Sequence, residues 1–247
     1  IYKMLKAPVK GFGIQQKGCP QGAIISPLLS NVVLNDLDKW IASQWEEFPT
    51  KRNYTKLNKY RAMQTTNLKE MFIVRYEDDF KIFSKDWKTA WKIFHAVKDY
   101  LKNYLKLEIS SEKSKVTNLR KRCSEFLGFE IKAIKKRKKY VANTHISKKN
   151  RQVIQEKVRE HLKIIQGNPN WESIKGYNSY ILGIHHYFGI ATHVNLDCSN
   201  IAYRLLYTQY NRLKSVGKYE IPRSPPTIYK KFYKNKLRTF KVCGQYL

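Results

Sequence analysis

The sequence has 247 residues, with 48 lysines and arginines against 19 aspartates and glutamates, and a formal net charge of +29. So strong a positive balance indicates a polyanionic partner, and the aromatic content of 13% supplies rings on which bases can stack. No uninterrupted apolar stretch reaches membrane-spanning length and no signal peptide is recognisable, which argues against a membrane protein, so no membrane partner is expected. A chain of this length can bury a core as one large or two modest domains.

The four cysteines lie far apart in the sequence, at Cys19, Cys123, Cys198 and Cys243. They have neither the spacing of a disulfide framework nor that of a zinc site, so a reducing compartment is expected. We predict the cytoplasm of a bacterium, or an organelle. Because the first residue is Ile1 and not a methionine, we expect that it is not the natural N-terminus.

The first long element is predicted to be a helix that begins at Ser26-Pro27. Residues 1–14 are expected to form a strand or loop, because proline and glycine break any helix there. Residues 18–22 give a turn signal, after which Ser26 supplies the helix cap and Pro27 the first helical position. Apolar residues then recur at helical spacing and are expected to face the core. They are Leu28, Leu29, Val32, Val33, Leu37, Trp40 and Ile41.

The most distinctive stretch is a predicted β-hairpin over residues 71–84. It follows residues 46–70, which are polar and without periodicity and are expected to form a long surface loop. Two short β-rich runs flank the acidic tip Glu77-Asp78-Asp79. Taken alone, this tip is explained equally well by turn chemistry and by a metal site. The next helix is predicted to pack on the sheet through Trp87, Trp91, Phe94, Val97, Leu101 and Leu105.

The second half changes from strands to helices. A strand is predicted over residues 125–131, followed by a basic turn at 135–139 and a returning strand at 140–142. Three helices are then predicted, the first capped by Ser147. Their ranges are 147–166, 171–188 and 198–216, and Pro222–Pro226 ends this helical unit.

This order of elements predicts an α+β fold, an antiparallel sheet with helices on one face, followed by an all-α unit of three helices. The expected boundaries are 1–145 for the α+β domain and 146–217 for the helical domain. Residues 218–247 are basic and aromatic without clear periodicity, and are expected to form a linker toward a further C-terminal region.

Five sequence blocks resemble, in the right order, those of the group II intron-encoded reverse transcriptase/maturases. The first two are Gly18–Leu29, with its Pro-Gln-Gly and Ser-Pro-Leu-Leu, and Val74–Phe80, with Arg-Tyr-x-Asp-Asp-Phe. The others are Ser111–Lys115, Phe126–Phe129 and Tyr177–Phe188, so that the likeness runs from about Gly18 to about Val216. The family usually has alanine where this chain has glutamate between the tyrosine and the first aspartate.

The resemblance implies both a polymerase and an RNA-binding function. Residues 1–145 would be a partial palm without the N-terminal fingers, and residues 146–217 the helical thumb or maturase domain. The activity implied is that of an RNA-directed DNA polymerase that also binds group II intron RNA and assists its splicing and retrohoming. The implied partners are the intron RNA, an RNA template with a DNA primer, dNTPs and a DNA target. The implied cofactor is Mg²⁺, with Mn²⁺ as a substitute.

The resemblance also assigns roles to individual residues. Asp78 and Asp79 would be the catalytic metal ligands. The primer, template and nucleotide would contact Tyr76, Gln21, Gly22, Lys113, Phe126, Leu127 and Gly128. A solvated lysine explains Lys113 equally well, and plain core packing explains the phenylalanines of the Phe126–Phe129 block equally well.

The metal site is expected to be one carboxylate short. Two-metal catalysis needs carboxylates around ions about 3.5–4 Å apart, and adjacent residues of a strand point to opposite faces. The family places a further aspartate upstream of its Pro-Gln-Gly block, but here no acidic residue precedes Asp36. Asp36 and Asp38 fall within a predicted helix and are poor substitutes. We therefore expect residues 1–247 alone to lack one catalytic aspartate and to be inactive.

The basic side chains predict an RNA surface that spans both domains, because charge so one-sided repels itself unless phosphates neutralise it. The candidate RNA-binding residues are Lys135, Lys136, Arg137, Lys138, Lys139, Lys148, Lys149 and Arg151. For His185 and His186 a packing role is favoured over metal binding, since no partner stands at ligand spacing.

Three alternatives stay open from the sequence. The first is a non-catalytic maturase, an RNA-binding splicing factor with a degenerate polymerase site. The second is another bacterial reverse transcriptase, of the retron or diversity-generating type. The third is a basic RNA-binding protein without polymerase ancestry, which leaves the ordered blocks unexplained.

Overall fold

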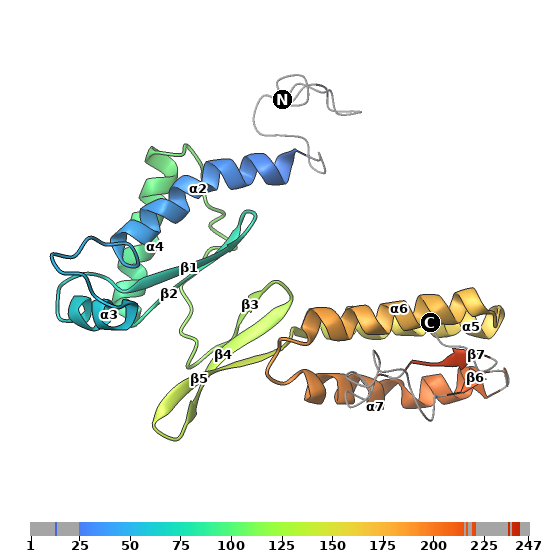
Figure 1. Cartoon of the computed structure of the whole chain (residues 1–247). Coiled ribbons are helices and arrows are strands. Elements are labelled where there is room, and N and C mark those ends of the chain that lie inside the picture. The colour runs from blue at the N-terminus through green and yellow to red at the C-terminus, as the bar shows by residue number, and fades with distance from the viewer. Residues whose placement is uncertain are drawn as a thin grey trace. The chain divides into compact units, whose positions relative to one another are not determined.

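The computed structural model describes residues 13, 25–214, 216, 219–220, 237 and 239–242 (Figure 1). The chain divides into two compact units, Ile1–Val116 and Thr117–Leu247. Both combine helices with small antiparallel sheets, so the prediction of a mixed helix and sheet fold is confirmed. A single palm sheet stays a prediction, because the sheets fall in different units. Among the helices described, none is long and apolar enough to cross a membrane.

Helix α2 (Ser26–Gln44) begins where the sequence predicts it, with Pro27 in its first turn. The N-cap is Ile25, so Ser26 is the first helical residue and does not cap the helix as predicted. Its buried residues are Leu34, Leu37 and Ile41. The prediction that apolar residues near the start of this helix face the core is wrong for Leu28, Val32 and Val33, which are 61%, 62% and 43% exposed. Periodicity identifies an apolar face, but not how far neighbouring elements cover it. The predicted elements at residues 1–12 and 18–22 lie outside the described residues.

Helix α3 (Lys56–Gln64) interrupts the stretch 46–70, for which the sequence predicts a loop. Its Met63 is buried, and its Tyr60 ring lies 6.0 Å from Trp45 and 5.8 Å from Phe72. The loop prediction is therefore wrong for these residues. The helix is polar over most of its surface, so it lacks the apolar stripe by which helices are recognised.

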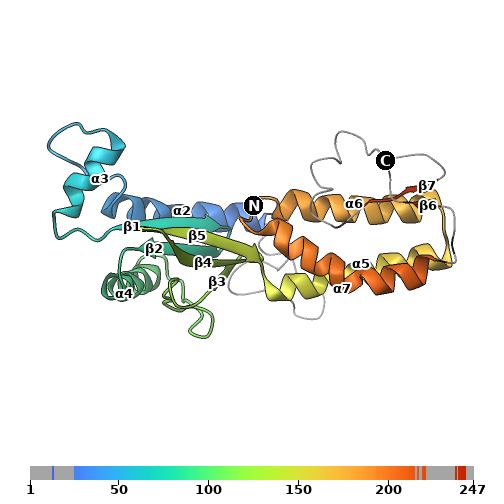
Figure 2. The same cartoon turned by 90° about the horizontal axis from the view of Figure 1, so that it is seen from below.

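The predicted hairpin is confirmed, with β1 (Met71–Tyr76) antiparallel to β2 (Asp79–Ser84). Helix α2 lies beside β1, and α4 (Trp87–Asn103) lies beside β2 (Figures 1 and 2). Asp86 caps α4 by accepting a hydrogen bond from the Thr89 amide at 2.9 Å.

The buried face of α4 differs from the prediction. It consists of Ile93, Val97 and Leu101, whereas Trp87 and Trp91 are 48% and 39% exposed. Those two indoles meet each other edge to face with centroids 6.0 Å apart. The apolar arc of α4 is wider than its contact with the hairpin, so spacing alone did not identify which part is buried.

The second unit opens with a three-stranded sheet in the order β3-β4-β5. The strands are β3 (Ser124–Phe126), β4 (Phe129–Lys136) and β5 (Lys139–Ile146). The single strand predicted over 125–131 is wrong, because the chain reverses at Leu127-Gly128. Their φ angles of 49° and 77° are both positive, as type I′ hairpin turns require. The basic turn and returning strand are confirmed, with Lys136 paired to Lys139 across the turn.

Three helices complete this unit: α5 (Lys148–Gly167), α6 (Trp171–Phe188) and α7 (Val194–Leu213). The predicted helices are confirmed, although α7 begins earlier than predicted. Ser147 caps α5, as predicted, by accepting a hydrogen bond from the Asn150 amide at 3.3 Å. Aliphatic side chains from all three helices form one buried core, centred on Leu162, Ile181 and Ile201.

The described residues near the C-terminus pack on that helical core. Strand β6 (Tyr219–Glu220) pairs with β7 (Lys241–Val242), and Leu237 and Phe240 are buried. The Asn178 side chain accepts from the Phe240 amide at 2.8 Å and donates to its carbonyl at 2.7 Å. Part of the stretch predicted as a linker thus belongs to the folded unit. Pro222–Pro226 lies outside the described residues.

Candidate functional site

The acidic tip of the β1–β2 hairpin is a two-residue turn. Glu77 and Asp78 form the turn between the paired residues Tyr76 and Asp79. All four side chains are exposed, with Tyr76 at 58%. Neither aspartate carboxylate makes an ion pair or hydrogen bond with another residue in the part of the chain described. Both are therefore accessible to a cation or to nucleic acid.

Arg75 fastens this tip to helix α2. Its Nη2 lies 2.6 Å from Asp38 Oδ2, and its Nη1 donates to Asn31 Oδ1 and to the Glu77 carbonyl, both at 2.7 Å. The hydrogen bond to Asp38 raises the pKa of the Arg75 guanidinium, which therefore stays charged. Asp38 lies within α2 and is engaged by this contact.

The tip offers ligands of the kind that Mg²⁺ takes, since hard cations prefer carboxylate oxygens. Asp78 and Asp79 supply these oxygens from adjacent positions, one in the turn and one at the start of β2. Across residues 25–214 and the shorter described stretches, no group of three or more His, Cys, Asp or Glu side chains could hold a metal ion. The described residues thus fit part of a metal site.

The other residues predicted to contact substrate belong to different parts of the sequence. Gln21 and Gly22 lie outside the described residues. Lys113 is exposed in a turn of the first unit. Phe126, Leu127 and Gly128 belong to the β3–β4 hairpin of the second unit. Of these residues, Lys113 belongs to the same unit as the acidic tip.

The β3–β4 hairpin is tied to helix α6. The Tyr187 hydroxyl donates to the Leu127 carbonyl at 3.1 Å. Phe129 stacks on Tyr187 with centroids 5.7 Å apart and meets Phe188 edge to face at 5.2 Å. A side chain at Gly128 would collide with the amide of Asn150, so close packing as well as its φ explains this glycine. Core packing therefore accounts for Phe129.

The basic hairpin tip, which we define as Lys135, Lys136, Arg137, Lys138 and Lys139, is exposed at all five positions. Arg120 adds to it, because its guanidinium lies 4.2 Å from the centroid of the Tyr140 ring. Sequence reasoning missed Arg120, since only the fold brings it beside β5.

The first turn of α5 contains two exposed lysines and an arginine that pairs with a buried carboxylate. Lys148 and Lys149 are exposed. Arg151, also predicted to contact RNA, lies 3.4 Å from the carboxylate of Asp197, which is 1% exposed. Its guanidinium therefore has a structural partner.

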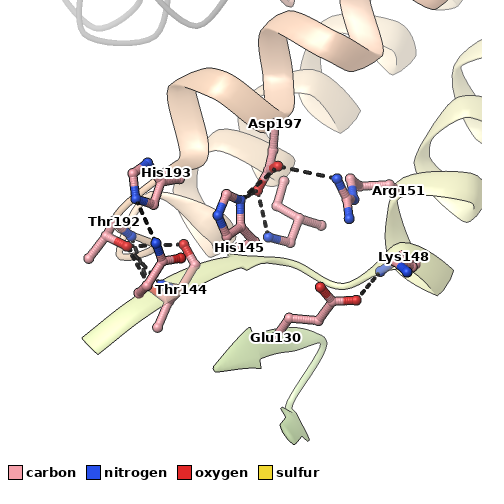
Figure 3. A network of polar contacts seen from close by, with 10 residues as sticks. Glu130, Thr144, His145, Lys148, Arg151, Thr192, His193 and Asp197 are labelled. Carbon is pink, nitrogen blue, oxygen red and sulfur yellow. Dashed lines mark hydrogen bonds and ion pairs between the residues drawn. The ribbon is translucent and has the colours of Figure 1, made fainter. Parts of the chain in front are cut away.

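Asp197 is the centre of a buried polar network (Figure 3). Its carboxylate accepts from the Ile146 amide at 2.8 Å and lies 3.1 Å from His145 Nδ1. His145 stacks on His193 with centroids 4.7 Å apart, and His193 Nε2 lies 3.1 Å from Asn143 Nδ2. The network joins the end of β5 to the starts of α5 and α7. It therefore attaches the base of the β4–β5 hairpin to the helices.

The remaining histidine prediction concerns helix α6. His185 is buried, with Nε2 3.2 Å from the Leu237 carbonyl and Nδ1 3.8 Å from Cys198 Sγ. Burial lowers the pKa of His185 and raises that of Cys198 to about 12. These contacts favour the predicted packing role. His186 is exposed.

Comparison with known sequences identifies the class of protein to which the chain belongs. The family described as reverse transcriptase (RNA-dependent DNA polymerase) matches residues 3–131. The chain belongs to this reverse transcriptase family. The matched range includes the acidic tip, Lys113 and the β3–β4 turn.

Individual proteins are also similar in sequence to this chain. The group II intron-encoded protein LtrA of Lactococcus lactis subsp. cremoris is 26% identical over 88% of this chain and 47% of its own length. Protein YkfC of Escherichia coli (strain K12) is 28% identical over 57% of the chain and 39% of its own. A putative COX1/OXI3 intron 1 protein of Saccharomyces cerevisiae is 29% identical over 53% of the chain and 20% of its own length. The chain thus spans less than half the length of these relatives. The predicted resemblance to group II intron-encoded proteins is confirmed.

Proposed function

We propose that this chain carries part of the palm and the helical thumb of a group II intron reverse transcriptase/maturase. The observation that carries the proposal is the acidic tip, where Asp78 and Asp79 are exposed on a turn fastened by Arg75. Membership of the reverse transcriptase family supports RNA-directed DNA synthesis as the chemistry of that tip. The proposed domains are a partial palm over 1–145, a thumb over 146–217 and a linker from 218.

Asp78 and Asp79 are the residues that would hold Mg²⁺ or Mn²⁺. The bound ions would lower the pKa of a primer hydroxyl and neutralise charge on the leaving pyrophosphate. The role of the chain itself is to present the two carboxylates at a fixed turn. We assign contact with the primer end to Tyr76, and its exposed ring and its pairing with Asp79 across the hairpin support this role. Template and dNTP contacts are assigned to Gln21, Gly22 and Lys113 by resemblance.

The second activity that we propose is binding of group II intron RNA to assist splicing and retrohoming into target DNA. Its support is the exposed basic hairpin tip together with the exposed Lys148 and Lys149 at the start of α5. The relative LtrA is itself a group II intron-encoded protein. Phosphate contacts by lysine and arginine give affinity without reading sequence, so intron specificity must come from RNA shape.

Residues 1–247 on their own are expected to give no primer extension with Mg²⁺. The physical reason is that no acidic residue precedes Asp36, and Asp38 is engaged by Arg75, so a third carboxylate for two metals is lacking. The measurement is extension of a labelled DNA primer on an RNA template. Extension by this stretch alone that Asp78→Asn abolishes would refute the expectation.

Replacing the five residues of the basic hairpin tip by alanine is expected to weaken binding of structured intron RNA and to flatten its dependence on salt. Each lost phosphate contact lowers the magnitude of the slope of log K against log salt by about 0.7–0.9, so the loss of about three to five contacts gives a drop of about 2 to 4.5. Filter binding or fluorescence anisotropy between low and moderate salt measures both quantities.

A variant with the same loss of charge provides the control. Lys85, Lys88, Lys92, Lys98 and Lys102 are also exposed, in or beside α4 of the first unit. Alanine at these five positions is expected to change affinity and slope less than the hairpin variant. Equal effects of the two variants would mean that total charge, and not the hairpin, determines RNA binding.

A non-catalytic maturase is the second candidate function. The observation that favours it is Glu77, which places a third acidic side chain on the turn where the family usually has alanine. In this alternative the basic hairpin tip still binds RNA. It would be supported if the product of the complete reading frame bound intron RNA but showed no primer extension that depends on Asp78.

A further inference from the structure

The contacts of Arg75 go beyond a simple ion pair. Its Nε donates to Asp38 Oδ1 and Oδ2 at 3.1 and 3.0 Å, and Nη2 donates to Oδ2 at 2.6 Å. The remaining arm of the guanidinium, Nη1, donates to Asn31 Oδ1 and to the Glu77 carbonyl, both at 2.7 Å. One side chain therefore connects two positions of helix α2 to the backbone of the hairpin turn.

The Glu77 carbonyl is the group that sets the position of the next residue, Asp78. Glu77 has a φ of 54°, which lies in the left-handed backbone region. Residues other than glycine adopt this region at a cost of about 1–3 kcal/mol. Such a turn needs an interaction that favours it over other turn conformations. The charge-assisted hydrogen bond from Nη1 supplies one, because it is made to the carbonyl in its present orientation.

The residue type distinguishes positioning from simple charge pairing. The side chains of Arg75 and Asp38 are 12% and 32% exposed, so water weakens their attraction and a lysine would preserve much of it. Only the planar fork of arginine places two nitrogens on the carboxylate while a third reaches Asn31 and the Glu77 carbonyl. A lysine keeps the charge and loses this geometry.

We infer that Arg75 is a positioning residue for the acidic tip: anchored on Asp38 and Asn31 of α2, it fixes the turn that carries Asp78 and Asp79. The inference rests on the proposed function, since it concerns the carboxylates assigned there to Mg²⁺. Residues that orient ligands from behind change metal affinity by about 10–100-fold when they are replaced. Arg75 does not itself contact the metal or the substrate.

The test measures metal binding at the tip without catalysis. Mn²⁺ is titrated into isotope-labelled protein of residues 1–247, and broadening of the amide signals of residues 77–80 gives an apparent affinity. Arg75→Lys is expected to weaken Mn²⁺ binding about 10-fold. Asn31→Ala, which leaves the ion pair intact, is expected to weaken it less. Hydrogen exchange across β1 and α2 reports in parallel whether the hairpin is folded.

Primer extension by the product of the complete reading frame is the second readout. Arg75→Lys is expected to raise the Mg²⁺ concentration for half-maximal rate while the affinity for RNA is unchanged. Wild-type Mn²⁺ affinity and Mg²⁺ requirement in both Arg75→Lys and Arg75→Ala, with the hairpin folded, would overturn the inference and leave the proposed function standing. If Asp78→Asn changed neither the Mn²⁺ broadening nor the rate of primer extension relative to wild type, the proposed function itself would be overturned.

Discussion

Asp78→Asn is expected to lower primer extension by at least about 100-fold in the product of the complete reading frame, because even residues behind a metal ligand contribute about 10–100-fold. Asparagine keeps the size of the side chain and removes the charge that a divalent cation requires. Asp78 is exposed and has no partner among the described residues, so the fold should not change. Single-turnover primer extension at saturating RNA measures the effect, and RNA affinity should be unchanged.

Asp36→Asn is the matched control for this prediction. It removes the same charge from an exposed position of the same unit, on helix α2 and outside the contacts of Arg75 with the hairpin turn. We expect its primer extension to match the wild type. If Asp78→Asn retained full activity with an unchanged Mg²⁺ requirement, the tip would be an ordinary solvated turn and the catalytic carboxylates would lie elsewhere.

Local chemistry allowed the hairpin and the helices to be predicted from the sequence. Two β-rich runs around an acidic pair define β1 and β2, and Ser147 marks the start of α5. The turn at Leu127-Gly128 was missed although Gly128 gave a local signal, because the surrounding residues read as one continuous strand. Helix α3 was missed because Met63 is its only buried residue, so no apolar stripe marks the helix.

Contacts between distant residues explain what the sequence could not reveal. Arg75 and Asp38 are 37 positions apart, and His145 and Asp197 are 52 apart. No spacing rule links such pairs, since their proximity depends on how whole elements pack. For the same reason Arg151 was predicted as one of several RNA-binding cations, whereas its partner is a carboxylate buried at the start of α7.

Asp197→Ala is expected to lower the free energy of unfolding of the second unit by about 2–3 kcal/mol. Breaking a buried ion pair costs about 3–5 kcal/mol when the remaining charge is trapped. Here Arg151 and His145 are 25% and 29% exposed, so water can solvate them in part. The Ile146 amide is left without its acceptor in the interior, which alone costs about 1–3 kcal/mol. Because water partly solvates the remaining charges, we expect the loss to lie where these two ranges meet, at about 2–3 kcal/mol.

Hydrogen exchange of the amides of α5 and α7, followed as a function of urea in the whole chain, measures this change for the second unit separately. Asp197→Asn provides the graded comparison: it keeps an acceptor for the Ile146 amide but loses the charge facing Arg151, so it should fall between wild type and Asp197→Ala. Glu156→Ala, at an exposed position of α5, should stay within about 0.5 kcal/mol of wild type. A loss below about 0.5 kcal/mol in Asp197→Ala would mean that the network is not essential to the junction of β5 with the helices, because replacing a merely exposed residue has an effect of that size.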